Sequence, residues 1–227
     1  GDALGTTLEF KRPGSFEPLT DMTGGGPFDL SPGQWTDDTS MALCLAESLL
    51  ACGGFDAEDQ MQRYVRWYRE GHLSSTGVCF DVGNTCRQSI EQFENTGEPF
   101  AGPTDPGSAG NGSIMRLAPI AMRWVADLPA VEEMAARSSR TTHGATEAVD
   151  ACRLLAAYLV GSLHGEPKVD LLSADCWPTR TILETTTLSP RIAEIANGSF
   201  LQKQPPEIRG TGYVVESLEA ALWAFAA

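Results

Sequence analysis

Two adjacent carboxylates, Asp37 and Asp38, follow Thr36 at the point where the sequence predicts that a buried helix begins. One interpretation is structural, because aspartate and threonine are common helix N-caps and acidic residues in a first turn suit the helix dipole. The other is chemical, because these carboxylate and hydroxyl oxygens are the hard ligands that Mg²⁺ and Mn²⁺ prefer. Both hold together if one oxygen caps the helix while another faces a metal ion.

A glycine-rich loop is the second candidate for chemistry. Its residues are Gly110, Asn111, Gly112 and Ser113. We predict that it leads into a helix over 114–126, whose first N–H groups favour a phosphate. It is not a P-loop, and an Asn-Gly turn with a serine N-cap explains the same residues without a ligand. Arg116 is then a partner either for a pyrophosphate or for a surface ion pair.

Five further polar residues are candidates, each with an ordinary structural explanation. Isolated acidic residues are usually caps or solvated side chains, and an Asp and an Asn before a predicted helix suit an N-cap. A histidine before a long apolar helix is more often a structural imidazole than a catalytic one. The five residues are Asp2, Glu9, Asp81, Asn84 and His143.

Apolar residues at helical spacing dominate the chain. They predict helices over 41–52, 57–69, 83–93, 114–126, 130–137, 145–163 and 213–225. Alternating strand patterns are almost absent. Several intervening segments are rich in Gly, Pro, Asp, Asn and Ser and are long enough to carry function: 11–36, 71–81, 96–113 and 202–212. We therefore predict an all-α fold, a single compact multi-helix domain over 1–227 with long functional loops.

The composition argues against two classes of partner. The 227 residues contain 16 Lys and Arg against 30 Asp and Glu, a formal net charge of -14. This field repels phosphate backbones and anionic lipids, and no apolar run reaches the roughly 18 residues of a membrane span, so we expect neither nucleic-acid nor membrane binding. The six cysteines form no CxxC pair and do not resemble a disulfide scaffold, which predicts a cytoplasmic protein.

The order of these features along the chain resembles the ADP-ribosylglycohydrolase family. The resemblance covers nearly the whole chain. It implies an all-α fold with two Mg²⁺ or Mn²⁺ ions at the base of a cleft for ADP-ribose. The matching motifs are Gly1-Asp-Ala-Leu-Gly5 with Glu9-Phe10, Trp35-Thr-Asp-Asp-Thr39, Asp81-Val-Gly-Asn-Thr85, Gly110-Asn-Gly-Ser-Ile-Met-Arg116, Thr142-His143, Gly212-Tyr-Val-Val and Leu218-Glu-Ala-Ala-Leu-Trp-Ala-Phe225.

The resemblance also implies a role for each motif. Thr36, Asp37 and Asp38 match the family's first metal-ligand cluster, and Glu9 matches its glutamate near the scissile ribose. Glu9, Asp37 and Asp38 are therefore the catalytic candidates. The residues expected to bind substrate are Asp2, Asp81, Asn84, Gly110, Asn111, Gly112, Ser113 and His143, with the glycine-rich loop on the diphosphate.

One part of the family pattern does not occur in this sequence. The resemblance implies a second metal-ligand cluster of the type Gly-Asp-x-Asp-Thr, some tens of residues after the Leu-Trp-Ala-Phe helix, and the sequence ends at Ala227 before that point. We therefore expect the sequence to be trimmed at both ends. Absence of this cluster from the natural gene would instead favour a non-catalytic protein.

Three functions stay open at this point. The first is a metal-dependent glycosidase that cleaves the bond between ADP-ribose and a protein side chain, arginine being the first substrate to test, or a related small ADP-ribosyl conjugate. The second is a non-catalytic ADP-ribose-binding or crystallin-like structural protein on the same fold. The third is a hydrolase of another phosphorylated nucleoside. The sequence predicts no oligomeric state.

Overall fold

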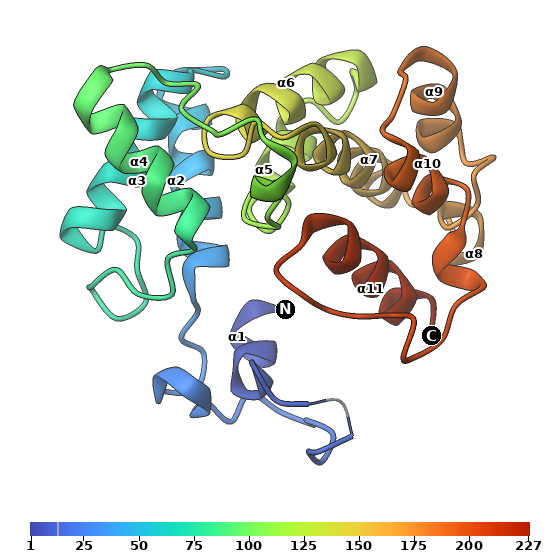
Figure 1. Cartoon of the computed structure of the whole chain (residues 1–227), viewed down its shortest axis with the longest axis horizontal. Helices are drawn as coiled ribbons and strands as arrows, with labels where there is room; N and C mark the ends of the chain where they lie inside the picture. Colours follow the sequence, from blue (N-terminus) through green and yellow to red (C-terminus); the bar gives the residue numbers. More distant parts are fainter. Residues whose placement is uncertain (13) are drawn as a thin grey trace.

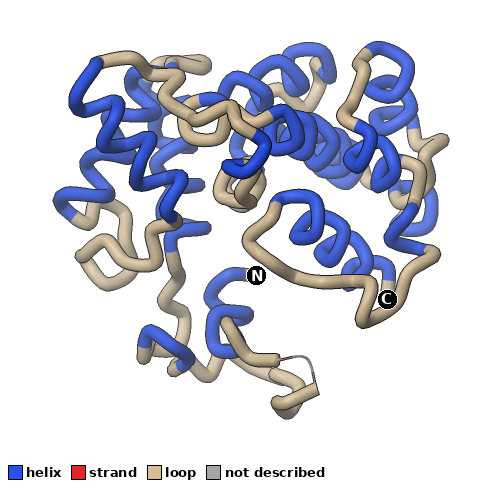
Figure 2. Tube along the Cα trace, viewed as in Figure 1, coloured by secondary structure: helices blue, strands red, loops and turns tan. Residues whose placement is uncertain are grey.

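The computed structural model describes residues 1–12 and 14–227 and is helical almost throughout (Figures 1 and 2). No β-strand occurs in the described residues, which contain only the isolated bridges Gly25 with Leu30 and Gly110 with Tyr213. The predicted all-α fold is confirmed. The α-helices are α1 (Asp2–Gly5), α2 (Asp37–Ala51), α3 (Ala57–Glu70), α4 (Asn84–Thr96), α5 (Ala118–Arg123), α6 (Leu128–Arg140), α7 (Thr146–Leu163), α8 (Lys168–Leu171), α9 (Trp177–Thr185), α10 (Pro190–Ala196) and α11 (Val214–Ala226). The 3₁₀ helices are η1 (Thr6–Leu8), η2 (Gly26–Phe28), η3 (Pro106–Ser108) and η4 (Ser199–Leu201).

Most of the predicted helices are present close to their expected bounds, but the one over 114–126 is much shorter. Residues 112–116 form turns, and α5 begins only at Ala118, with Pro119 in its first turn. Proline fits the first turn of a helix and disfavours helical backbone before it, so the helix starts beside Pro119. The apolar spacing gave no helix between 164 and 201, where the structure has the short helices α8, α9 and α10.

Two groups of buried apolar side chains hold the helices together. The larger group surrounds α7, which packs against α5, α6, α9, α10 and α11. The smaller group lies between α2, α3 and α4 and includes Met41, Met61, Trp67 and Ile90. Figure 1 shows these as two bundles with α5 between them, and the N-terminal segment lies below both. The start of α2, the N-terminal segment and the approach to α11 are therefore brought close together.

The helix ends follow local sequence signals. Asp56 caps α3 by accepting a hydrogen bond from the N–H of Asp59, and α3 ends at Gly71, whose φ is 71°. A Cβ at Gly71 would lie 2.1 Å from the carbonyl oxygen of Gly77, so only glycine allows the loop after α3 to fold back this closely. That loop carries the chain to Asp81. In the part of the chain that the structure describes, no helix is both long and apolar enough to cross a membrane.

Candidate active site

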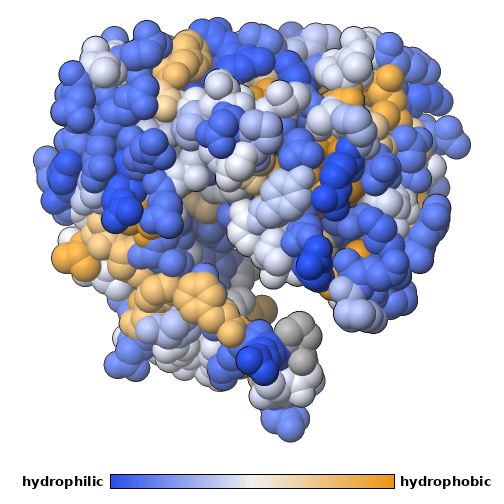
Figure 3. All heavy atoms as spheres, viewed as in Figure 1, coloured by the Kyte–Doolittle hydropathy of each residue, from blue (hydrophilic) through white to orange (hydrophobic). Residues whose placement is uncertain are grey.

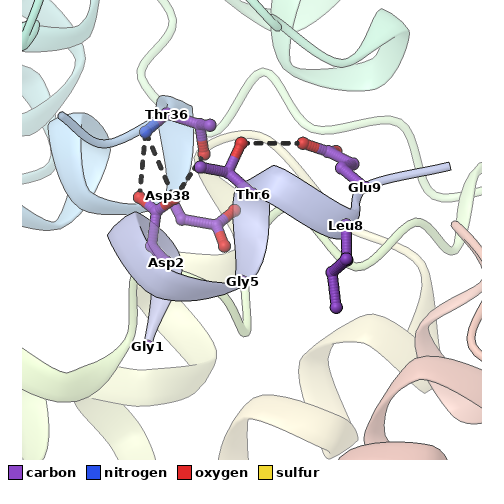
Figure 4. A pocket seen from close by; sticks show the side chains of 8 residues that line it. All are labelled: Gly1, Asp2, Gly5, Thr6, Leu8, Glu9, Thr36 and Asp38. Atoms are coloured by element: carbon purple, nitrogen blue, oxygen red, sulfur yellow. Dashed lines mark hydrogen bonds between the residues drawn. The ribbon is translucent and has the colours of Figure 1, made fainter. Parts of the chain in front are cut away.

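Two adjoining cavities open at the start of α2, one of about 360 Å³ and one of about 700 Å³. Glu9 and Asp38 line both, so the two cavities form one acidic site. The first cavity, drawn in Figure 4, is lined by Gly1, Asp2, Gly5, Thr6, Leu8, Glu9, Thr36 and Asp38. The second is lined by Glu9, Phe10, Lys11, Arg12, Asp37, Asp38, Asp81, Gly83, Asn111, Met115, Gly210, Thr211, Gly212 and Ser217.

Asp2 provides the cap of α2. Its carboxylate accepts hydrogen bonds from the N–H groups of Thr36, at 3.0 Å, and Thr39, at 3.2 Å, and from both threonine hydroxyls. Figure 4 shows the bonds between Asp2 and Thr36. Thr36 occupies the N-cap position but makes no capping bond with its own side chain. The cap therefore comes from α1, and the carboxylates of Asp37 and Asp38 are not needed for it. Asp2, predicted to bind substrate, lines the first cavity with its carboxylate already satisfied by four donors.

Replacing Asp2 by alanine is expected to lower the free energy of unfolding by about 1–2 kcal/mol, because α2 loses its cap and α1 loses its attachment to α2. Urea denaturation followed by circular dichroism measures this change. Asp170→Ala, on the exposed side of α8, is the matched control and should have little effect. Equal denaturation midpoints for Asp2→Ala and the control would contradict the capping role.

Four carboxylates, those of Glu9, Asp37, Asp38 and Asp81, line the second cavity, and two of them also line the first. Burial, followed by the charges of Asp38 and Asp81, raises the pKa of Asp37 to about 9. Burial, together with Asp2 and Glu9, raises the pKa of Asp38 to about 6. Burial and the charge of Asp38 raise the pKa of Asp81 to about 6, and burial and Asp81 also raise the pKa of Glu9. The site therefore resists holding all its carboxylates ionised at neutral pH.

None of the four acids forms a salt bridge with a cationic side chain of the described residues. Lys11 and Arg12 line the second cavity without pairing to any of them. Partly buried like charges are costly unless a counter-charge joins them. The electrostatics of the site therefore favour a bound cation.

Thr36, Asp37 and Asp38 offer one hydroxyl and two carboxylates to such a cation. The negative charge favours a cation, but the protein ligands do not enclose one. No three His, Cys, Asp or Glu side chains in the described residues are arranged as a metal site. Mg²⁺ usually keeps several waters and takes only one or two protein carboxylates. The residues present therefore fit a hydrated Mg²⁺ or Mn²⁺ better than an ion enclosed by protein ligands.

The glycine-rich loop lies only partly on the cleft. Asn111 lines the second cavity, and its side-chain amide donates to Ser217 Oγ at 3.2 Å. The other three residues of the loop, Gly110, Gly112 and Ser113, line neither cavity. The loop also continues into turns instead of a helix, since α5 begins at Ala118. The helix N-terminus that we expected to support a phosphate is therefore not present at this loop.

His143 lies behind the glycine-rich loop and not on the cleft wall. The residue is only 2% exposed, and its Nδ1 lies 2.9 Å from the hydroxyl oxygen of Thr142. Burial, with a smaller effect of Arg116, lowers the pKa of His143 to about 3, so the ring stays neutral. His143 therefore lines neither cavity, and its position suits a structural imidazole, while its predicted contact with substrate stays a prediction.

Gly112→Ala is expected to destabilise the protein by about 1–3 kcal/mol, because a Cβ at Gly112 would lie 2.8 Å from His143 Cε1 and 2.9 Å from Cys86 Sγ. Both neighbours are buried, so the loop itself must shift. Thermal unfolding monitors the loss. Gly54→Ala, where an added Cβ meets nothing within 4 Å, is the control. If the two variants unfold at the same temperature, the loop does not need glycine for this contact.

A comparison with protein families settles where the chain belongs. The model of the family described as ADP-ribosylglycohydrolase matches residues 1–227. This chain belongs to the ADP-ribosylglycohydrolase family. The resemblance seen in the motifs is thereby confirmed. The chain is 46% identical over 224 residues to a protein named ADP-ribosylarginine hydrolase Tri1 from Pseudomonas putida (strain GB-1), and 42% identical over 224 residues to the protein of the same name from Serratia proteamaculans (strain 568).

The coverage of these relatives is unequal. Each of the two alignments takes in 99% of this chain but 58% of the relative. A protein from Rhodospirillum rubrum named ADP-ribosyl-[dinitrogen reductase] glycohydrolase is 39% identical over 159 residues, which is 68% of this chain and 51% of that protein. A solved structure described as an ADP-ribosylglycohydrolase-related protein complex superposes with a TM-score of 0.82 at 44% identity, over 100% of this chain and 71% of that one. The ADP-ribosylglycohydrolase fold is therefore shared across the whole chain.

In this ADP-ribosylglycohydrolase family member Arg116 is fully buried, so it cannot form a surface ion pair. It also lines neither cavity. Its guanidinium donates to the carbonyl oxygens of Gly112, at 3.0 Å, and Ser138, at 3.3 Å, and to the hydroxyl of Thr142 at 2.7 Å. It makes no salt bridge within the described residues. Arg116 thus holds the glycine-rich loop from behind, as a positioning residue.

The sequence analysis identified only some of the residues that line the cavities. Asn84, the first residue of α4, is exposed and accepts a hydrogen bond from Arg87, while its neighbour Gly83 lines the second cavity. Sequence reasoning missed the cavity residues Phe10, Met115, Gly210, Thr211, Gly212 and Ser217. Two signals were available: Phe10, Met115 and Gly212 stand inside the matching motifs, and the predicted long loop 202–212 contains Gly210, Thr211 and Gly212.

Proposed function

We propose that this chain is the part of a metal-dependent ADP-ribosylglycohydrolase that cleaves the glycosidic bond between ADP-ribose and an arginine side chain of a modified protein. The observation that carries the proposal is the group of four carboxylates that line the second cavity, none of which forms a salt bridge within the described residues. The family match supports the bond type. The names of the two Tri1 relatives support arginine as the linkage.

The reaction sets the demands on the site. Water adds to C1 of the ribose while the C1–N bond to the guanidine breaks, and the proton of the water passes to the leaving nitrogen. The transition state carries oxocarbenium character at C1, so the ribose must be oriented and the water activated. Glu9 lines both cavities and is the residue that we assign to position the water or to carry its proton.

Thr36, Asp37 and Asp38 would hold two Mg²⁺ or Mn²⁺ ions with water completing the coordination, and the ions would supply Lewis-acid chemistry and charge for the anionic diphosphate. Asp81 lines the second cavity with Asp37 and Asp38 and adds to the negative potential that would attract the ions. Asn111 faces the second cavity and is the loop residue that we assign to contact the ligand. A chain of net charge -14 needs such local features to accept an anionic ligand.

The same proposal includes the remaining expectations about partners and location. We expect an ADP-ribosylated protein as the partner, and neither nucleic acid nor membrane, because of the strongly acidic composition. All six cysteines are free thiols, which supports a reducing compartment such as the cytoplasm.

The test is release of ADP-ribose from an arginine-ADP-ribosylated protein by the natural gene product, with Mg²⁺ and then with chelator. Metal-dependent release supports the proposal. Binding of ADP-ribose without release from protein or small conjugates would favour the non-catalytic alternative. Release that chelator leaves unchanged would contradict the metal site while keeping the hydrolase.

A further inference from the structure

Three phenylalanines form a continuous aromatic surface beside the acidic site. The ring centroids of Phe10 and Phe28 are 6.4 Å apart in an edge-on arrangement, and those of Phe28 and Phe80 are 5.3 Å apart. We call Phe10, Phe28 and Phe80 the aromatic ledge. Its members come from three separate parts of the chain, so the tertiary fold assembles it.

The aromatic ledge is attached directly to the site. Phe10 follows Glu9 in sequence, and Phe80 precedes Asp81, so each end of the ledge is next to a carboxylate of the cavity wall. Phe10 itself lines the second cavity. Phe10 and Asp81 both have positive φ, 61° and 59°, a conformation that costs non-glycine residues roughly 1–3 kcal/mol and tends to occur at functional sites.

The aromatic ledge is open to solvent at the end nearest the cavity. Phe10 is 79% exposed, and Phe28 and Phe80 are half-buried. Figure 3 shows an apolar patch on the lower part of this face, over the N-terminal segment and the loop before α4. Phe10 contributes little to the core at this exposure, so packing does not explain its orientation. A phenyl ring held in solvent at the rim of a site suits contact with a partner.

The chemistry of the aromatic ledge favours a basic polypeptide. Aromatic faces attract guanidinium and ammonium groups and accept the apolar stems of arginine and lysine side chains. The net charge of -14 and the carboxylates beside the ledge attract the same groups. Free ADP-ribose is anionic and is expected to enter the cavities, not to cover an exposed phenyl ring at their rim.

We propose that the aromatic ledge binds the polypeptide that flanks the modified arginine and so makes the site selective for ADP-ribosylated protein over small ADP-ribosyl conjugates. This rests on the proposed function, because it assigns the polypeptide side of the substrate to a surface of the same site. Phe10 is the specificity-determining residue, since it joins the ledge to the cavity.

The test compares two substrates with one variant. The natural gene product and its Phe10→Ala variant are assayed with Mg²⁺ on an arginine-ADP-ribosylated protein and on ADP-ribosylarginine as the free amino acid. We expect Phe10→Ala to lower kcat/KM on the protein substrate by about three- to tenfold, which is the range expected for a lost cation–π contact. The loss should appear mainly as a higher KM. On the small conjugate we expect a change below about twofold. Phe225→Ala is the control, because Phe225 is also exposed but lies on α11 and lines neither cavity of the site.

The outcomes separate the two proposals. Equal loss on both substrates would overturn the ledge, because Phe10 would then act on the ADP-ribose side or on the fold. No loss on the protein would overturn it as well, while the proposed hydrolase stands on the cleavage of the small conjugate. If the natural gene product, without the Phe10→Ala substitution, cleaves neither substrate, the proposed function fails and the ledge proposal fails with it.

Discussion

Asp37→Asn is expected to lower kcat/KM for ADP-ribose release by about a thousandfold, the scale of losing an essential charged group from a catalytic site. Asp37 is 8% exposed, lies in the first turn of α2 and faces the second cavity. Asparagine has nearly the same shape as aspartate but lacks the negative charge that would bind a divalent cation. Hydrolysis assays on arginine-ADP-ribosylated protein measure the activity.

The same variant should be more stable than the parent when no divalent cation is present. Burial and neighbouring carboxylates raise the pKa of Asp37 from 3.8 to about 9, so folding at neutral pH requires this carboxyl to take up a proton, and the resulting loss of stability grows as pH rises from about 4 to about 9. We expect Asp37→Asn to gain on the order of 2 kcal/mol in metal-free buffer at pH 8. Asp170→Asn on α8 is the control. A variant that loses activity and stability together would indicate a structural role for Asp37 instead.

Arg116→Ala is expected to cost about 3–5 kcal/mol of unfolding free energy, the largest loss of stability that we predict. The side chain is fully buried and donates to the carbonyl oxygens of Gly112 and Ser138, which would lose these donors. It also lies 4.7 Å from the ring centroid of Tyr64, so truncation opens a cavity. Chemical denaturation of the purified variant measures the loss.

A comparison with lysine isolates the geometry of the guanidinium. Arg116→Lys keeps the charge but cannot reach several acceptors as a planar fork does, so we expect it to recover only part of the stability. Arg123→Ala is the matched control, because Arg123 also donates to a backbone carbonyl, that of Gly53, but from the surface. If Arg116→Ala is no more harmful than the control, Arg116 does not hold the loop.

Sequence reasoning succeeded where one pattern extends over many residues. The apolar spacing in α3 and α7 is long and regular, and it placed both helices within a few residues of their bounds. The candidate site was proposed from the order of short motifs along the whole chain, although each motif alone had a structural explanation. Glu9, Asp37 and Asp38 line the adjoining cavities, and their catalytic and metal-binding roles stay predictions.

What the sequence missed depends on contacts between distant residues. Nothing in the local pattern around Asp2 shows that its carboxylate caps α2, since its partners lie 34 and 37 residues away. Arg116 is a charged residue whose buried guanidinium is satisfied by a carbonyl oxygen in α6 and a hydroxyl in the turn after α6. The aromatic neighbour of Phe10 is likewise a residue of another element, Phe28 in η2, which the local sequence around Phe10 does not show. Short helices such as α10 have too few residues for a spacing pattern to emerge.

The cap on α2 has a thermodynamic consequence. Asp2 supplies this cap, so detachment of the N-terminal segment that carries Asp2 and fraying of the first turn of α2 are a single local unfolding event. A ligand seated between Glu9 and Asp38 touches both sides of that opening and must suppress it. The amide hydrogens of Thr36 and Thr39 are therefore a reporter of occupancy, and their exchange with solvent should slow in proportion to the bound fraction, whether or not any bond is cleaved.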